Sequence, residues 1–224
     1  MAAKPVDPLY QLTETMTLQR GMTYAVYGDQ ASGKTAFCAL AGLHAAASGV
    51  KTLYVSTQPQ STTALISRLC EALNEPRTIL ENISVMDERV QPNVSAVLVA
   101  AQGTYGTIIY DSVTVQYRQF IAENPDLALS RNKLLLRTLA ELHSIRNRFG
   151  CTLIYTSTYG SQPLGKPTAI TALNYFSDVL IMLKRVGANT YHAEVRIPYS
   201  GSAFRYSYSM DAFGFKKMSC ERAG

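Results

Sequence analysis

Hydrophobic positions along the chain follow two different spacings, which predict two kinds of element. Short apolar runs rich in β-branched residues and tyrosine, closed by glycine or a polar residue, are typical of strands. The predicted strands cover residues 23–27, 52–56, 83–86, 107–110 and 151–156. Longer segments with apolar residues three or four positions apart are typical of helices. The predicted helices cover residues 33–47, 61–73, 94–102 and 129–149.

After the last of these strands, the alternation of strand and helix gives way to strands alone. Three consecutive runs, 178–183, 191–197 and 203–210, are separated by short turns and predict a meander. Repeated β–α units followed by such strands are typical of an α/β fold. We therefore predict a mostly parallel central sheet with helices on both faces and antiparallel strands toward the C-terminus.

The composition excludes several protein classes. The chain has 224 residues, of which 47% are hydrophobic and 17% charged, as expected of a globular domain rather than a disordered chain. Its four cysteines are scattered without a CxxC pair, so neither a zinc site nor a disulfide framework is expected. No apolar run is long enough to span a membrane. We expect a cytoplasmic, nucleoid-associated protein without a membrane partner.

The distribution of charge suggests a polyanionic partner. Residues 1–117 carry a formal charge of −2 and residues 118–224 a charge of +7, within a total of +5. A basic half joined to a nearly neutral half is typical of proteins that bind nucleic acid. The alternative is that this charge serves solubility alone.

A phosphate-binding motif follows the first predicted strand and opens the first predicted helix. Residues 28–35 read GDQASGKT, which fits the Walker A pattern GxxxxGK[ST]. In such a loop, backbone N–H groups and the helix N-terminus surround the phosphates, the lysine contacts the β- and γ-phosphates, and the hydroxyl binds Mg²⁺. We therefore assign ATP contacts to Gly28, Asp29, Gln30, Ala31, Ser32, Gly33, Lys34, Thr35 and Ala36. Lys34 is also the candidate catalytic lysine, and Thr35 a candidate metal ligand.

A second element of the nucleotide site is predicted at Asp111. The strand at 107–110 ends in this carboxylate. In phosphate-loop proteins such an acid lies beside the loop and helps to hold Mg²⁺. The alternative is that Asp111 only caps the next turn.

With these motifs in place, the stretch from Gly21 to about Phe215 resembles the core of RecA-type recombinases, and especially the archaeal RadA paralogues called RadB. The matching segments are 28–35, 54–58, 108–118, 134–158 and 178–183 with the strands that follow. The resemblance implies a three-layer P-loop NTPase fold that binds ATP and Mg²⁺ and contacts DNA or a recombinase filament. It divides the chain into a short N-terminal extension, 1–20, and a RecA-like core, 21–224.

The chain departs from this family at three positions that matter for hydrolysis, one after the second core strand and two in the sensor pair. A hydrolysing member carries a glutamate just after the second core strand, where this chain has Gln58. Glutamine can hydrogen-bond the attacking water but cannot accept its proton as a carboxylate does. The family's Asn-Gln sensor pair is replaced by Ser157 and Thr158. We therefore expect weak or no hydrolysis, unless the register is shifted and Asp87 or Glu88 supplies the acid.

Two segments beyond the strand ends are candidate DNA contacts, because open α/β sheets bind ligands at this edge. The first, 116–132, contains Arg118 and Arg131. The second, 159–171, contains Tyr159 and Lys166 among glycine, serine and proline residues. A tyrosine can stack on a base and a lysine can pair with phosphate. The alternative for each of these residues is an ordinary surface connection.

Three hypotheses for function follow. The first is an ATP-binding accessory protein of homologous recombination and DNA repair, which binds single- or double-stranded DNA, the main recombinase, or both. The second is an active DNA-stimulated ATPase with strand-exchange activity. The third is a regulatory ATPase of the KaiC-like type that acts on protein partners. No aromatic-x-x-Ala polymerisation segment stands out in residues 1–20, so we expect a monomer or weak homo-oligomer rather than stable filaments.

Overall fold

The computed structural model describes residues 18–88, 102–115, 128–158, 170–211 and 214–223. The strands are β1 Thr23–Gly28, β2 Thr52–Ser56, β3 Ile83–Asp87, β4 Thr107–Asp111, β5 Thr152–Thr158, β6 Val179–Arg185, β7 Thr190–Ile197, β8 Ser202–Asp211 and β9 Gly214–Ala223. The helices are α2 Lys34–Ala47, α3 Pro59–Ala72, the 3₁₀ helix η1 Arg77–Asn82, α6 Ala128–Phe149 and α7 Ile170–Phe176.

The described strands form one sheet of nine, in the order β3-β2-β4-β5-β1-β6-β7-β8-β9. The first six in this order pair in parallel, and β7, β8 and β9 continue the sheet in antiparallel fashion. The predicted α/β class, with a mostly parallel sheet and antiparallel strands toward the C-terminus, is confirmed. Residues 94–101 of the predicted helix at 94–102 lie outside the described residues.

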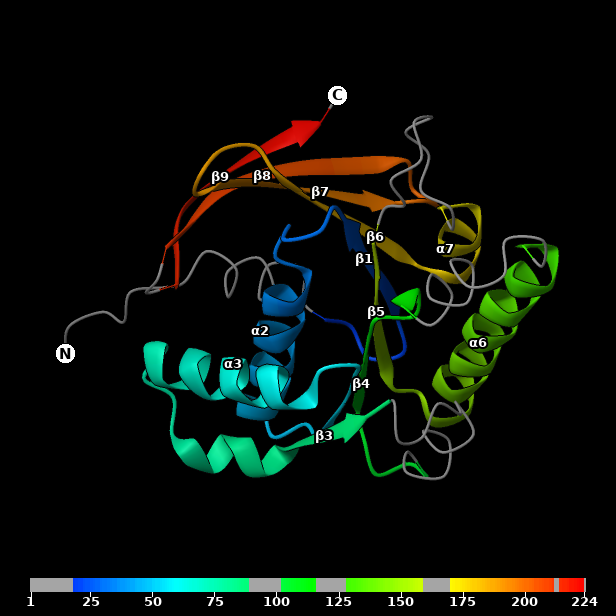
Figure 1. Ribbon diagram of the computed structural model, residues 1–224, viewed down its shortest axis with the longest axis horizontal. Coiled ribbons are helices and arrows are strands. Elements are labelled where there is room, and N and C mark those ends of the chain that lie inside the picture. The colour runs from blue at the N-terminus through cyan, green and yellow to red at the C-terminus, as the bar shows by residue number, and fades with distance from the viewer. Residues whose placement is uncertain (1–17, 89–101, 116–127, 159–169, 212–213, 224) are drawn as a thin grey trace.

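Helices cover the two faces of the sheet, which makes three layers (Figure 1). On one face, Phe37, Leu40 and Leu43 of α2 are buried against the central strands. On the other face, α6 buries the apolar residues that its spacing predicts, namely Leu135, Leu139, Leu142 and Ile145. No helix among the described residues is long and apolar enough to cross a membrane.

The antiparallel strands explain why α2 is apolar on most of its surface. Strands β7 and β8 curve over this helix, as Figure 1 shows. Their inward residues Tyr191, Val195 and Tyr206 belong to the same buried cluster as α2. A helix enclosed on several sides has no need of a polar face. The C-terminal strands therefore complete the core around the helix that follows the phosphate-binding motif.

Candidate nucleotide-binding site

The GDQASGKT segment forms the connection between β1 and α2, as the motif requires. β1 ends at Gly28 and α2 begins at Lys34. A Cβ atom at Gly28 would lie 2.0 Å from the backbone oxygen of Leu183 in β6, so only glycine fits this close approach. Gly33 has φ of +91°, a left-handed conformation that glycine adopts without strain. Backbone geometry therefore explains why both fixed positions of the motif are glycine.

The Lys34 side chain folds back over this loop. Its ammonium donates to the backbone oxygens of Gly28 at 3.1 Å and Asp29 at 2.6 Å, and to Ser32 Oγ at 3.4 Å. The residue is only 9% exposed. The side chain thus places an ammonium at the loop, where an approaching anion can meet it.

Asp111 is held in a fixed orientation at the carboxyl end of β4. Tyr54 Oη donates to its Oδ2 at 3.0 Å, and Thr156 Oγ1 donates to its Oδ1 at 2.5 Å. Burial, together with the nearby Asp111 carboxylate, raises the pKa of Tyr54 well above its usual value, so the phenol remains a donor. A carboxylate has about four acceptor positions, so these two bonds leave capacity for a cation or for water.

A cavity of about 480 Å³ brings the predicted elements together at the carboxyl ends of the parallel strands. Among the predicted site residues, Gln30, Ala31, Lys34, Thr35, Gln58 and Asp111 line it. Its volume lies within the range of about 300–1,000 Å³ that is typical of small-ligand sites. The cavity therefore joins the cationic loop to a carboxylate and a threonine hydroxyl.

Gln58 lies between β2 and α3, at the edge of this cavity. Its backbone N–H donates to Ser56 Oγ at 3.0 Å, and Ser56 Oγ in turn lies 2.8 Å from Thr62 Oγ1. These bonds fix the turn and leave the Gln58 side chain exposed. Among the described residues that line the cavity, Asp111 is the only acidic one. Within this part of the chain, no second carboxylate stands in the cavity beside Gln58.

The alternative acids, Asp87 and Glu88, do not line the cavity. Glu88 is 2% exposed, and its Oε1 accepts a hydrogen bond from Tyr110 Oη at 2.5 Å. Burial raises the pKa of Glu88 above its usual value, and the bond from Tyr110 partly offsets this. Tyr110 packs in the cluster under α6, on the opposite face from α2.

The two positions predicted to replace the family's sensor pair, Ser157 and Thr158, differ in their surroundings. Thr158, the last residue of β5, lies beside Gly28 in the parallel register and lines the cavity. Its backbone N–H donates to Thr114 Oγ1 at 3.2 Å. Ser157 is 2% exposed. A threonine at 158 is shorter than the glutamine of the family and presents a hydroxyl to the cavity in place of an amide.

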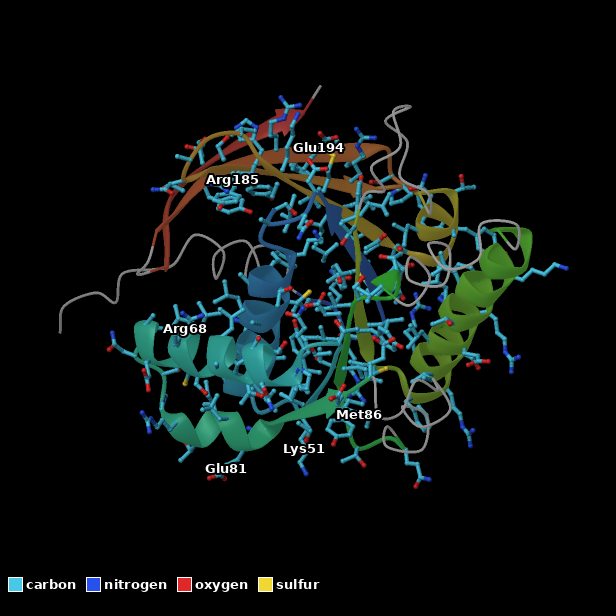
Figure 2. All side chains as sticks on the ribbon, in the orientation of Figure 1. Lys51, Arg68, Glu81, Met86, Arg185 and Glu194 are labelled. Carbon is cyan, nitrogen blue, oxygen red and sulfur yellow. The ribbon has the colours of Figure 1, made fainter. Side chains whose placement is uncertain are left out.

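Sequence reasoning missed several residues that line the cavity, two of them in α3 among others, and both side chains that orient Asp111. Arg68 and Leu65 line the cavity from α3, and Figure 2 shows Arg68 on the outer part of this helix. Tyr54 and Thr156 orient Asp111 from the neighbouring strands. Strand alternation could have pointed to Tyr54. It precedes Ser56 by two residues, so the two side chains lie on the same face of the sheet, and Ser56 pairs with Asp111 on the neighbouring strand. Helix phase alone does not reveal Arg68.

The remaining candidates stand apart from the cavity or outside the described residues. Ala36, which the motif places among the nucleotide contacts, packs against the core and does not line the cavity. Arg131 lies in α6, and the structure describes only its backbone. Arg118, Tyr159 and Lys166 lie outside the described residues.

Comparisons with known proteins agree with this geometry. A family model described as Rad51 matches residues 11–176. The DNA repair and recombination protein RadB of Methanococcoides burtonii is 23% identical over 202 residues, which is 87% of this chain and 86% of the relative. RadB of Thermoplasma volcanium is 26% identical over 101 residues, 45% of this chain and 43% of the relative.

A solved structure shows the same fold. The crystal structure of the RadB recombinase superposes with a TM-score of 0.68 at 21% identity, covering 93% of this chain and 96% of that chain. At this identity the likeness establishes the fold, which is of the RecA type.

Proposed function

The chain belongs to the Rad51 family of the RecA-type proteins, and from this premise we propose that it is an ATP-binding accessory protein of homologous recombination and DNA repair. In this role it binds ATP with Mg²⁺ and hydrolyses it weakly or not at all. The observation that carries the proposal is the cavity at the phosphate-binding loop, whose described lining residues include the motif's lysine and threonine but no glutamate.

The donor set of the cavity suits ATP with Mg²⁺. The Lys34 ammonium and the start of α2 supply positive charge for the phosphates. Thr35 offers a hydroxyl and Asp111 a carboxylate, and both are oxygen ligands that Mg²⁺ prefers. When bound, Mg²⁺ neutralises phosphate charge. The protein's own part is to hold Asp111 in place through Tyr54 and Thr156.

The chemistry at Gln58 supports binding over turnover. Hydrolysis requires a group that orients water and accepts its proton. The Gln58 amide can orient water, but it is not basic. The alternative acids, Asp87 and Glu88, do not line the cavity. ATP then acts mainly as a conformational ligand, which favours whichever state of the protein binds it more tightly.

The partners follow from the family and from the charge distribution. The relatives are named for DNA repair and recombination. The half of this chain with charge +7 suits a polyanion. We propose DNA and a recombinase as partners and a monomer or weak homo-oligomer as the resting state. The candidate DNA contacts remain Arg118, Arg131, Tyr159 and Lys166.

The decisive experiment measures ATP binding and ATP turnover side by side, each with and without single-stranded DNA at one stated salt concentration. We expect binding with little turnover. The Gln58→Glu variant should raise turnover while ATP affinity stays unchanged, because it supplies the missing base. Gln60→Glu is the matched control, since Gln60 lies two residues further along, in the first turn of α3, and does not line the cavity.

The outcomes separate the hypotheses. Brisk turnover by the wild-type protein, raised further by DNA, would show an active recombinase and contradict the accessory role. Absence of ATP binding would contradict the nucleotide site itself. No gain from Gln58→Glu, with binding intact, would show that Gln58 does not occupy the position of the base.

A further inference from the structure

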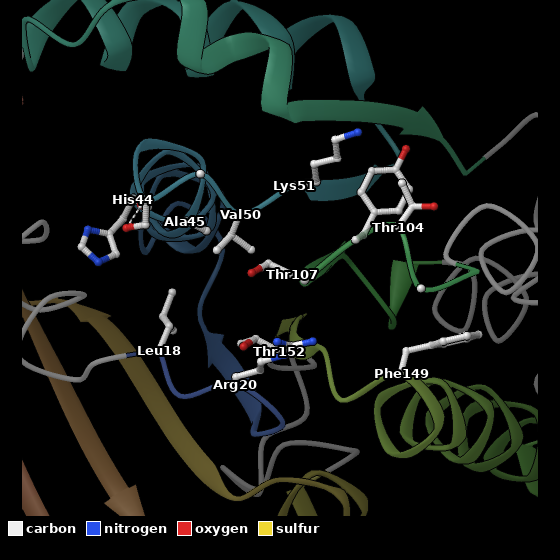
Figure 3. Close-up of a pocket in the computed structure, with 15 residues that line it drawn as sticks. Leu18, Arg20, His44, Ala45, Val50, Lys51, Thr104, Thr107, Phe149 and Thr152 are labelled. Carbon is white, nitrogen blue, oxygen red and sulfur yellow. Dashed lines mark hydrogen bonds between the residues drawn. The ribbon is translucent and has the colours of Figure 1, made fainter.

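A second cavity lies at the amino ends of the parallel strands, on the edge of the sheet opposite the nucleotide site. Its volume is about 420 Å³, and Figure 3 shows the fifteen residues that line it. Thr107 and Thr152, the buried first residues of β4 and β5, contribute to it. Figure 2 places Lys51 at this end of the molecule, far from Arg185 and Glu194 on the C-terminal strands. The cavity shares no residue with the nucleotide site.

The walls of this cavity come from four separate segments. The last turns of α2 contribute His44 and Ala45, and residues 103–106 contribute a turn before β4. Phe149 lies at the end of α6, and Leu18 precedes β1. Because elements far apart in sequence and held by the core form its walls, the cavity is a property of the fold rather than of one loop. Its aromatic and aliphatic walls suit a flat apolar group.

The charged side chains that line this cavity are of one sign as far as the structure describes them. Arg20 and Lys51 line it, and none of the described lining residues is acidic. Arg20 Nε donates to the backbone oxygen of Gly150 at 3.2 Å, which fixes the guanidinium beside the opening. Among the residues that the structure describes, neither Arg20 nor Lys51 forms an ion pair. Two such cations make the cavity attractive to an anion.

We propose that this cavity binds a small planar anion, an aromatic ring that carries a carboxylate or a phosphate. The ring packs against Phe149 and Val50, and the anionic group pairs with Lys51 and Arg20. The volume suits a ligand of drug size, and an apolar wall with a few polar groups is typical of small-molecule sites. A bidentate guanidinium recognises carboxylate and phosphate alike.

The test uses 2-naphthoate, 2-naphthyl phosphate and the neutral 2-naphthamide as probes on the full chain. Titration calorimetry gives the affinities, and amide chemical shifts give the location. We expect both anions to bind more tightly than the amide. We also expect the largest shifts at Gly103, Gly106 and Thr152, which line the cavity. The tighter anion identifies whether the natural ligand is a carboxylate or a phosphate.

Variants connect the affinity to the cavity. Lys51→Gln should weaken 2-naphthoate binding about fivefold, the effect of losing one partly exposed ion pair. Lys184→Gln, an exposed lysine at the other end of the molecule, should leave it unchanged. Thr104→Trp places a large ring at the exposed rim and should abolish binding.

Equal affinity for 2-naphthoate and 2-naphthamide would overturn the proposal, as would shifts that map to the nucleotide site. ATP affinity serves as an independent readout, because Lys51→Gln and Thr104→Trp leave the phosphate-binding loop intact. Loss of probe binding in a variant that still binds ATP therefore reports on this cavity and not on folding.

Discussion

Lys34→Ala removes the one ammonium that the phosphate-binding loop holds, and the size of its effect can be worked out from the structure. A unit charge about 4 Å from an anionic oxygen is worth about 4 kcal/mol at the effective dielectric of a protein site. Lys34 already donates to the Gly28 and Asp29 oxygens at 3.1 and 2.6 Å. The ammonium must weaken these hydrogen bonds in order to contact a phosphate, which reduces its net contribution to ATP binding by about 1 kcal/mol.

The net loss on substitution is therefore about 3 kcal/mol, which corresponds to about a hundredfold weaker ATP binding. Titration of a fluorescent ATP analogue with Mg²⁺ measures it, and circular dichroism verifies the fold. Lys51→Ala is the matched control, because Lys51 is exposed and does not line the nucleotide cavity. A folded Lys34→Ala protein with wild-type ATP affinity would refute the assignment of the site.

Three other substitutions test the site and its surroundings. Asp111→Asn should weaken ATP binding about tenfold when Mg²⁺ is present and have little effect in EDTA, since the carboxylate contributes to ATP binding through the metal; equal losses in both titrations would contradict this role. Gly28→Ala would place a Cβ 2.0 Å from the Leu183 oxygen, so it should cost about 1–3 kcal/mol of stability and lower the thermal midpoint of unfolding. An unchanged midpoint would show that the loop can move away from β6. Because burial raises the native pKa of Glu88 above its usual 4.5, the native state binds this proton more tightly than the unfolded state does. Stability from this group is complete below the unfolded pKa and is lost as the pH rises through the native pKa. Glu88→Gln, which keeps an acceptor for Tyr110, should therefore gain stability relative to wild type as the pH rises from 4.5 to neutral, as measured by urea denaturation; a constant difference would contradict it.

Local patterns predict the parallel part of the fold well, because each of its elements carries its own signal. The apolar run TYAVY, the glycine pair and the alanine-rich helix correspond to β1, the loop and α2. β9, by contrast, was not predicted. Its sequence GFKKMSCERA has no alternating apolar pattern, and its strand conformation comes from pairing along β8. Such an edge strand is set by tertiary contacts rather than by intrinsic propensity.

The candidate site shows the same division between local and tertiary information. Lys34, Thr35 and Asp111 can be named from spacing, and the structure brings all three to one cavity. The side chains that hold Asp111 depend on the register of three parallel strands, which no single segment encodes. Arg68 lines the cavity because α3 packs beside α2. The spacing between Gln58 and Arg68 in the sequence does not predict that both residues line the same cavity.

The net charge of +7 already subtracts the acidic residues of the C-terminal half, but it does not say which of its cations are available to DNA. Within the described residues of that half, Arg196 and Arg205 pair with Glu194, and Arg146 pairs with Asp178. These arginines form ion pairs with the protein's own carboxylates, and the Arg146 side chain is largely buried.

Strands β6 to β8 also have a structural task, since Leu183 abuts Gly28 and the Tyr208 hydroxyl lies 3.9 Å from a Cβ built on Gly33. Part of the basic C-terminal half therefore packs against the phosphate-binding loop and supports it. DNA binding then has to depend on individual lysines and arginines that are not held in ion pairs. The slope of the DNA affinity against salt concentration measures how many of these residues contact phosphates.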